Sequence, residues 1–309
     1  MRTAYISHTE CRNHDTGPGH PEEPRRLTAI EDRLLVTGLT EVLRHIDAPE
    51  VTREQLLRVH TAGYLDSLES LLPKSGLAHL DPDTVLCPES LKAARRAAGA
   101  VVTAVDRILG GELDSAFCGV RPPGHHAERN RGTGFCLYNN IAVGVAHALE
   151  AHGLGRVAVV DFDVHHCNGT EDIFKDDGRV LVCSTFQHPF YPNTPLLPDA
   201  PNRVSVPLDA RAKSTEFRAA ITQRWMPALR AFDPEMIFIS AGFDAHQDDF
   251  MSQVCLTDAD YRWVTEQIVA VAEESASGRI ISALEGGYEL NSLARCAETH
   301  LRVIMGLHA

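Results

Sequence analysis

The chain has 309 residues, of which 44% are hydrophobic and 23% are charged, and its formal net charge at pH 7 is −13. These proportions are typical of a globular protein that buries a sizeable core without disulfides, and they exclude a disordered or collagen-like chain. The negative charge argues against nucleic acid as a partner, because such binding depends on a basic surface; no apolar run approaches the roughly 20 residues that span a bilayer, which argues against a membrane.

Short β-branched runs alternate with helical patterns along the chain. In chain order, strands are expected at residues 2–7, 115–120, 157–162, 180–185, 236–240 and 280–284. Helices are expected at residues 90–109, 140–152, 215–232 and 258–275, and residues 52–88 read less regularly, as loops or helices above the sheet. Because such alternation with continuous apolar strands is typical of a parallel sheet covered on both faces, we predict one α/β domain over residues 1–309.

The eight cysteines are scattered, and none forms a Cys-x-x-Cys pair. A disulfide scaffold is not expected in a chain of this length, so the pattern favours reduced thiols and a cytoplasmic location. The first 21 residues are polar where a signal peptide would need an apolar stretch, which agrees with that location.

Reactive side chains follow four of the predicted strands directly. The four segments are Arg121-Pro-Pro-Gly-His-His126, Asp161-Phe-Asp-Val-His-His166, Ala241-Gly-Phe-Asp-Ala-His246 and Glu285-Gly-Gly-Tyr288. Ligands of open α/β sheets bind at the carboxyl ends of the strands. We therefore expect these segments to form one site at that edge of the sheet.

Asp163, His165 and Asp244 are the candidate metal ligands. The first two are separated by one residue on an extended chain, so their side chains point the same way. Three protein ligands leave an open position for water or substrate, which is the pattern of catalytic zinc sites, and the oxygen and nitrogen donors also suit iron or manganese. The alternative is that Asp163 and His165 cap loops or pair with each other.

Asp161 lies deeper in the same strand, where a carboxylate is costly unless it accepts hydrogen bonds or holds a cation. We expect it to orient a histidine or to bind a monovalent cation, and the alternative is a helix cap. His125 and His126 follow a rigid Pro-Pro-Gly turn and are candidates to divide proton transfer between them. The hydroxyl of Tyr288 is a candidate to stabilise an oxyanion.

Two loops, at residues 132–136 and 189–192, carry aromatic side chains. These rings are candidates for the walls of a narrow channel. The alternative is that they pack beneath their own loops.

The four segments, together with His20-Pro-Glu22 and Gly134-Phe-Cys136, resemble the zinc-dependent histone deacetylase family. The resemblance covers nearly the whole chain and is strongest to the bacterial class II-like members, the histone deacetylase-like amidohydrolases, with acetylpolyamine amidohydrolases as near relatives. It implies the arginase–deacetylase fold, a single domain with an eight-stranded parallel sheet between helices.

The resemblance also implies a role for each matching residue. The metal ligands for Zn²⁺, or for Fe²⁺, are Asp163, His165 and Asp244. The catalytic residues are the acid/base pair His125 and His126, their partners Asp161 and Asn168, and the transition-state tyrosine Tyr288. The channel residues are Gly134, Phe135 and Tyr191. The ligands of a structural potassium ion, K⁺, are Asp161, Asp163, His165 and Ser184.

The sequence departs from the family pattern at two places. Cys167 stands where relatives have Gly, which costs roughly a kcal/mol or more if this position needs a positive φ, and its thiol is a candidate for oxidation near the metal site. Residues 192–195 read Pro-Asn-Thr-Pro instead of Pro-Gly-Thr-Gly, so the rim of the channel is expected to differ in shape.

These observations predict a metal-dependent amidohydrolase that uses activated water to remove acetyl or another short acyl group from lysine side chains or similar amines. The main alternative is acetylpolyamine hydrolysis. Met251 aligns with an acidic gatekeeper of polyamine-preferring relatives, which favours lysine-like substrates, although Asp83 or Glu89 remain candidates to replace that charge.

Two further alternatives are an inactive acyl-lysine binding module, against which Tyr288 argues, and an arginase-like hydrolase, which would need a second metal site. The sequence is compatible with a homo-oligomer and does not specify the oligomeric state.

Overall fold

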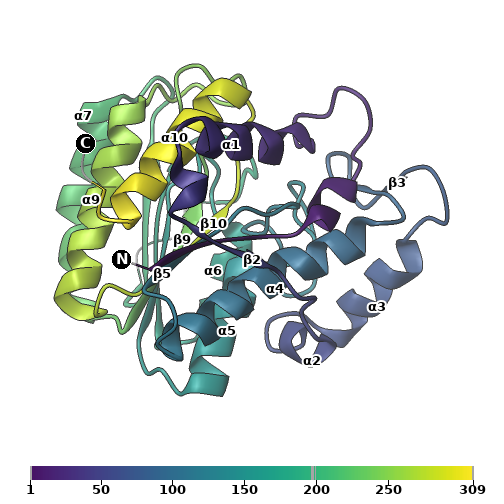
Figure 1. The fold of residues 1–309 in the computed structure, drawn as a ribbon, viewed down its shortest axis with the longest axis horizontal. Coiled ribbons are helices and arrows are strands. Elements are labelled where there is room, and N and C mark those ends of the chain that lie inside the picture. Colours follow the sequence, from purple (N-terminus) through teal and green to yellow (C-terminus); the bar gives the residue numbers. More distant parts are fainter. Residues whose placement is uncertain (1, 196–197, 199, 308–309) are drawn as a thin grey trace.

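The structure is a computed structural model that describes residues 2–195, 198 and 200–307. Within these residues eight strands form one parallel sheet in the order β2-β1-β5-β10-β9-β6-β7-β8 (Figure 1). Their bounds are β1 Thr3–Ser7, β2 Arg44–Asp47, β5 Ser115–Cys118, β6 Val157–Asp161, β7 Val180–Gln187, β8 Arg203–Leu208, β9 Met236–Ala241 and β10 Ile280–Leu284. The α/β fold with an eight-stranded parallel sheet is therefore confirmed.

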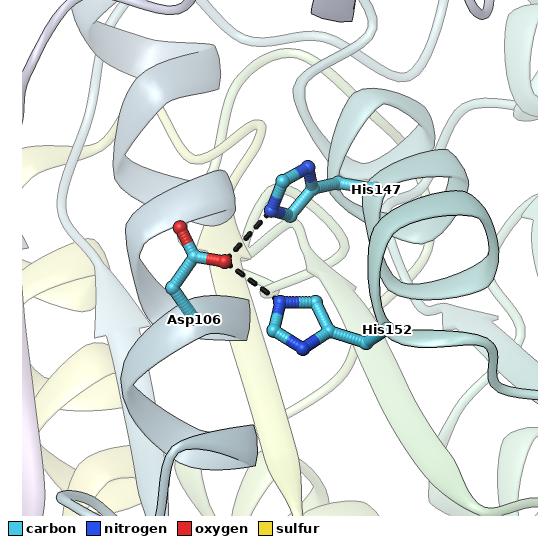
Figure 2. A group of neighbouring side chains, drawn as sticks. All are labelled: Asp106, His147 and His152. Atoms are coloured by element: carbon cyan, nitrogen blue, oxygen red, sulfur yellow. Dashed lines mark hydrogen bonds and ion pairs between the residues drawn. The ribbon is translucent and has the colours of Figure 1, made fainter.

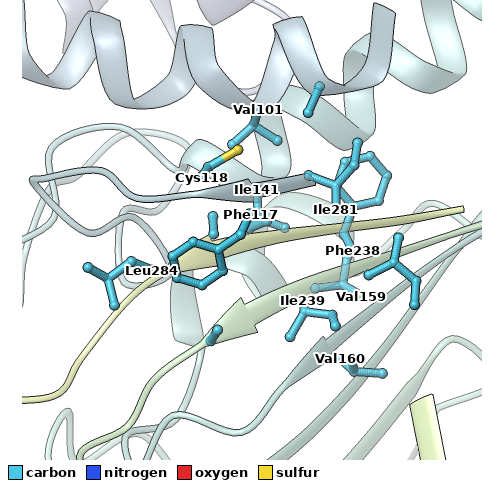
Figure 3. Packing of buried hydrophobic residues seen from close by; sticks show 14 of the residues in the cluster. Val101, Phe117, Cys118, Ile141, Val159, Val160, Phe238, Ile239, Ile281 and Leu284 are labelled. Atoms are coloured by element: carbon cyan, nitrogen blue, oxygen red, sulfur yellow. The ribbon is translucent and has the colours of Figure 1, made fainter. Parts of the chain in front are cut away.

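Helices cover both faces of this sheet. Helix α4 (Ser90–Leu109) packs against α5 (Asn140–His152), and α10 (Leu290–Ile304) packs between α1 (Arg25–Val36) and α9 (Asp258–Ser275) (Figure 1). The inner strands β6, β9 and β10 are buried along their whole length, which explains their continuous apolar sequence. Figure 3 shows Val101 of α4 and Ile141 of α5 among the side chains of the sheet.

Smaller elements complete the chain. They are α2 (Arg53–Leu56), α3 (Ala62–Leu71), the antiparallel pair β3 (Ala78–His79) and β4 (Val85–Leu86), and α6 (Asn168–Phe174). Among the helices that the structure describes, none combines the length and the apolar character that a bilayer crossing requires. The eight cysteines all lie in described residues, and none forms a disulfide.

Most predicted elements agree with the structure: three of the helices have the predicted bounds, and the strands differ by at most two residues at an end. The helix expected at residues 215–232 is instead α7 (Ser214–Ala220), a π-helical turn (Ile221–Trp225) and α8 (Met226–Phe232). Pro227 provides the physical reason, because it has no N–H to donate and its ring crowds the preceding turn, which the wider π-turn accommodates.

Candidate active site

The carboxyl ends of β5, β10, β9 and β6 lie side by side, because these four strands are consecutive in the sheet. The four reactive segments follow these strands, so their loops meet at one edge. In the register, Asp161 pairs with Ser240, and Ser240 pairs with Ala283. The topology therefore brings together side chains that are far apart in the sequence.

Asp163, His165 and Asp244 form a buried group whose potential ligand atoms all lie within 4.8 Å of one another. His165 Nδ1 lies 3.0 Å from Asp163 Oδ1 and 3.1 Å from Asp244 Oδ2. Gly286 N donates to Asp163 Oδ2 at 2.8 Å, and Val164 N donates to Asp244 Oδ1 at 2.9 Å. Apart from this contact with His165, the buried Asp244 Oδ2 meets no hydrogen-bond partner among the described residues, so it can accept a further ligand.

The electrostatics of this group fit a cation. Burial and the charge of Asp163 raise the pKa of Asp244 to about 7. Although burial opposes the shift, hydrogen bonds to Asp163 and Asp244 raise the pKa of His165 to about 9. Without a metal, protons on His165 and Asp244 thus compensate the negative charge of the two buried carboxylates. A divalent cation would supply this positive charge instead. Carboxylate oxygens and one imidazole with an open position are the donor set of catalytic zinc and also suit iron.

His125 and His126 meet different partners. His125 Nδ1 lies 2.9 Å from a carboxylate oxygen of Asp161, whereas His126 Nδ1 lies 2.7 Å from the amide oxygen of Asn168. Although burial opposes it, the charges of Asp163 and Asp161 raise the pKa of His125 to about 10. Burial and the positive charge of His125 hold the pKa of His126 well below its ordinary value. One imidazole is therefore charged and its neighbour is neutral, which is the arrangement expected of an acid/base pair.

The surroundings of Asp161 explain why a carboxylate is buried there. Besides the contact with His125, Asp161 Oδ1 accepts a hydrogen bond from Asp163 N at 3.0 Å. Helix α6 begins at Asn168 with Cys167 as its N-cap residue, so Asp161 is not a helix cap.

Glu285 anchors the histidine segment, a contact that sequence reasoning missed although the residue lies in one of the four segments. Its carboxylate accepts hydrogen bonds from Gly124 N at 2.7 Å and His125 N at 3.1 Å, and from the hydroxyl of Ser240 at 3.2 Å. Burial raises the pKa of Glu285 to about 7. The β10 loop thus fixes the backbone direction of His125.

Tyr288 is held at the cavity by its neighbours. The Arg26 guanidinium lies 4.9 Å from the centre of its ring, and Phe135 meets the same ring edge-on at 5.9 Å. Arg26 is fully buried and donates from Nε to Gly287 O at 2.6 Å. Its guanidinium also pairs with Glu22, which forms a second buried pair with Arg121. Sequence reasoning assigned no role to Arg26, since Gly287 and Tyr288, which it contacts, lie at the other end of the chain.

A cavity of about 310 Å³ opens above these groups. The residues that line it include His125, His126, Gly134, Phe135, His165, Phe190, Tyr191, Met251 and Tyr288, with Asp83 and His20 also lining it. The three expected channel residues and Met251 therefore line one cavity, and Glu89 is not among its lining residues. The aromatic rings of both loops face this space rather than packing only beneath their loops.

Phe190 is one of the aromatic residues at 189–192 that the sequence predicted as wall candidates, although the resemblance assigned the wall position to Tyr191. Its ring stacks on the ring of His165 at 5.4 Å, with an angle of 17° between the planes. The hydroxyl of Tyr191 instead lies 2.8 Å from Thr133 Oγ1. Gly134 allows the loop at residues 132–136 to approach the His126 ring closely, because a Cβ atom at this position would lie 2.4 Å from His126 Cδ2.

Cys167 does not behave as the sequence suggested. Its φ is −79°, so this position carries none of the strain that replacing a positive-φ glycine would cause. Its side chain is fully buried, and burial raises the pKa of the thiol well above its ordinary value. The expectation of an oxidation-sensitive thiol is therefore disfavoured, since reactivity requires an accessible thiolate.

Ser184 lies on β7 beside Asp161, its partner in the strand register. Its hydroxyl oxygen is buried near the Cys167 thiol and has no oxygen or nitrogen partner among the residues that the structure describes. A buried hydroxyl without a partner is unfavourable unless another ligand satisfies it.

A second group with metal-binding residue types joins α4 to α5 (Figure 2). Asp106 Oδ1 lies 2.7 Å from His147 Nε2 and 2.8 Å from His152 Nε2. Arg58 Nη1 lies 2.7 Å from His147 Nδ1, and a guanidinium can only donate. His147 Nδ1 therefore accepts a hydrogen bond, and the ring proton lies on Nε2, which donates to Asp106. A metal ion would need a free lone pair on that nitrogen. We therefore interpret this group as a hydrogen-bonded link between the two helices.

Comparisons with known proteins agree with the fold. The histone deacetylase domain model matches residues 20–304 of the chain. The histone deacetylase-like amidohydrolase of Pseudomonas aeruginosa is 33% identical over 100% of this chain and 87% of its own length. A solved structure of the HDA15 HD domain superposes with a TM-score of 0.92 at 32% identity, covering 99% of this chain and 90% of that one. The chain belongs to the histone deacetylase family, whose members are deacetylases or amidohydrolases and so hydrolytic enzymes.

Two relatives are longer proteins. Type-2 histone deacetylase 2 of Dictyostelium discoideum is 36% identical over 99% of this chain, which spans 21% of that protein. Human polyamine deacetylase HDAC10 is 34% identical over 92% of this chain, which spans 44% of its length.

Proposed function

We propose that the protein is a metal-dependent deacetylase that removes an acetyl group from lysine side chains or similar amines. The observation that carries this proposal is the convergence of Asp163, His165 and Asp244 in one buried group, beneath a narrow cavity that is also lined by two histidines and a tyrosine. A zinc or iron ion held by these three residues would polarise the amide carbonyl of the substrate and lower the pKa of a water molecule.

His126 is the residue best suited to move the proton. Its Nδ1–H donates to Asn168 Oδ1, so Nε2 carries a lone pair that can accept a proton from the attacking water. The charged His125 beside it stabilises negative charge as the carbonyl carbon becomes tetrahedral. The proton on His126 Nε2 then passes to the departing amine, which completes the hydrolysis.

Tyr288 completes the stabilisation of the reacting carbonyl. Burial holds the pKa of its phenol well above the ordinary value, so it remains a hydrogen-bond donor at neutral pH. Donation of this hydrogen bond to the developing oxyanion is a role worth several kcal/mol in such sites. The rings of Phe135, Phe190 and Tyr191 leave space for an apolar stem such as the methylenes of lysine and keep water out.

A structural potassium ion is part of the proposal. Its ligands would be Asp161, Asp163, His165 and Ser184. The buried hydroxyl of Ser184, which lies beside Asp161 in the strand register and has no oxygen or nitrogen partner among the described residues, supports a monovalent cation at the base of the site. Such an ion would fix the backbone from which the metal ligands project.

Polyamine deacetylation is the second candidate. It is supported by the similarity to human polyamine deacetylase HDAC10 and by the carboxylate of Asp83 among the residues that line the cavity. Met251 lines the same cavity with an apolar side chain, which offers a second ammonium no partner and favours a lysine-like substrate.

One comparison separates the two candidates. The purified protein, with its metal content determined, is offered an acetyl-lysine peptide and acetylspermidine at physiological salt. The proposal expects kcat/KM for the peptide to be at least equal to that for the polyamine. A preference for acetylspermidine of more than about tenfold, or 1.4 kcal/mol, would establish the second candidate instead.

A further inference from the structure

Asp249 lies in the loop after β9 and is buried, with 6% of its surface exposed. Its carboxylate accepts three backbone hydrogen bonds. Oδ1 accepts from Met251 N at 2.9 Å, and Oδ2 accepts from Tyr288 N at 2.6 Å and from Glu289 N at 3.0 Å. One side chain thus joins the loop that carries Met251 to the loop that carries Tyr288.

Burying a carboxylate to connect two loops costs desolvation free energy. Burial raises the pKa of Asp249, and its compensation comes mainly from the three N–H groups. Glu289 is the N-cap residue of α10, so the charge also faces the positive end of that 15-residue helix. Two of the three donors are the backbone N–H groups of Tyr288 and Glu289, so Asp249 holds the backbone of Tyr288 in position.

We propose that Asp249 is a positioning residue, which holds the Tyr288 phenol in place over the cavity and ties the Met251 side of the cavity to the same anchor. This inference rests on the proposed function, since the role of the phenol belongs to it. Asp249 touches neither the reacting groups nor the three metal-ligating side chains; it acts through Tyr288. Removing it should misplace the phenol while leaving the metal ligands intact.

The three hydrogen bonds predict different effects for two substitutions. In Asp249→Ala all three N–H groups lose their acceptor, and kcat should fall roughly ten- to a hundredfold, as expected when a catalytic group is misplaced by about 1 Å. In Asp249→Asn the amide oxygen can still serve the two donors at Tyr288 and Glu289, while its NH₂ group faces Met251 N. This variant should keep most of kcat and raise KM.

A double-mutant cycle with Tyr288→Phe distinguishes positioning from general damage. If Asp249 acts through the phenol, Asp249→Ala should cause no further loss of kcat once that hydroxyl is gone. Asp248→Ala is the matched control: the neighbouring carboxylate is 49% exposed and pairs with Arg295, so kcat should not change. An equal loss of kcat from Asp249→Ala in both backgrounds would overturn the proposal.

Amide hydrogen exchange supplies a readout that does not need turnover. In both Asp249 variants the metal content should stay unchanged, and the amides of Tyr288 and Glu289 should lose protection in Asp249→Ala but much less in Asp249→Asn. Unchanged protection in Asp249→Ala would overturn the proposal whatever the substrate proves to be. If Asp249→Ala does not fold, Asp249→Asn decides: a kcat as low as that of Tyr288→Phe would contradict the geometry.

Discussion

Replacing Gly286 by Ala tests the geometry of the metal group without removing a ligand. A Cβ atom at this position would lie 2.1 Å from Asp244 Oδ2 and 2.6 Å from Asp163 Oδ2. Asp244 Oδ2 must therefore retreat by about 0.9 Å to reach even the 3.0 Å that real Cβ contacts keep. Metal–ligand distances tolerate changes of only about 0.2 Å, so the three donors can no longer converge on one ion.

We expect Gly286→Ala to weaken binding of Zn²⁺ at least ten- to a hundredfold, a magnitude typical of disturbed ligand orientation. The assay is isothermal titration of metal-free protein with Zn²⁺, accompanied by thermal unfolding. Gly63→Ala in α3 is the control, because no atom lies within 4 Å of its added Cβ and a helical Ala is favourable. Unchanged Zn²⁺ affinity in Gly286→Ala would refute the assignment of these carboxylates.

Three further predictions concern other residues. Tyr288→Phe should keep the bound metal and the fold but lose about two to three orders of magnitude in kcat for an acetyl-lysine peptide, as for an oxyanion donor; a loss of only a few-fold would make Tyr288 a packing residue. Although burial opposes it, the charge of Arg121 lowers the pKa of Glu22 to about 2, so its ionised form contributes about 3 kcal/mol of stability that is present above pH 4.5 and lost as the pH falls toward 2. The difference in free energy of unfolding between wild type and Glu22→Gln, measured in urea, should therefore shrink over that range, and a constant difference would contradict the pairing. Met251→Glu should shift kcat/KM toward acetylspermidine by roughly ten- to a hundredfold, because a partly desolvated carboxylate would meet the second ammonium; an unchanged ratio would show that Met251 does not contact this part of the substrate.

The interior of the fold is the part that the sequence predicts well. β6, β9 and β10 are buried on both faces, so their apolar runs stand out in the sequence. The edge strands β2 and β8 were not predicted, because β2 is mostly exposed with one apolar residue among polar ones, and β8 is only partly buried along most of its length. Neither strand therefore has the continuous apolar run that identifies the inner strands.

The candidate site likewise has a part that the local sequence predicts and a part that depends on contacts between distant residues. Asp163 and His165 are predictable because their spacing on an extended chain sets their common direction. Asp244 was a candidate because it follows another predicted strand, but local patterns do not reveal that β9 lies beside β6, which is what brings it to the other two. Arg26 and Asp249 act on backbone groups of the loop around Tyr288, far away in sequence, and neither residue belongs to a motif that indicates such a contact.

The central claim is that a metal held by Asp163, His165 and Asp244 is required for deacetylation. It is tested most directly by measuring acetate release from an acetyl-lysine peptide by metal-free protein as Zn²⁺ is added back, in the wild type and in Asp244→Asn, with bound metal determined in the same samples. We predict that activity in the wild type rises with metal until about one ion is bound at the site, and that Asp244→Asn neither retains the ion nor recovers activity. Acetate release by the metal-free wild type, or full metal content and turnover in Asp244→Asn, would contradict the account.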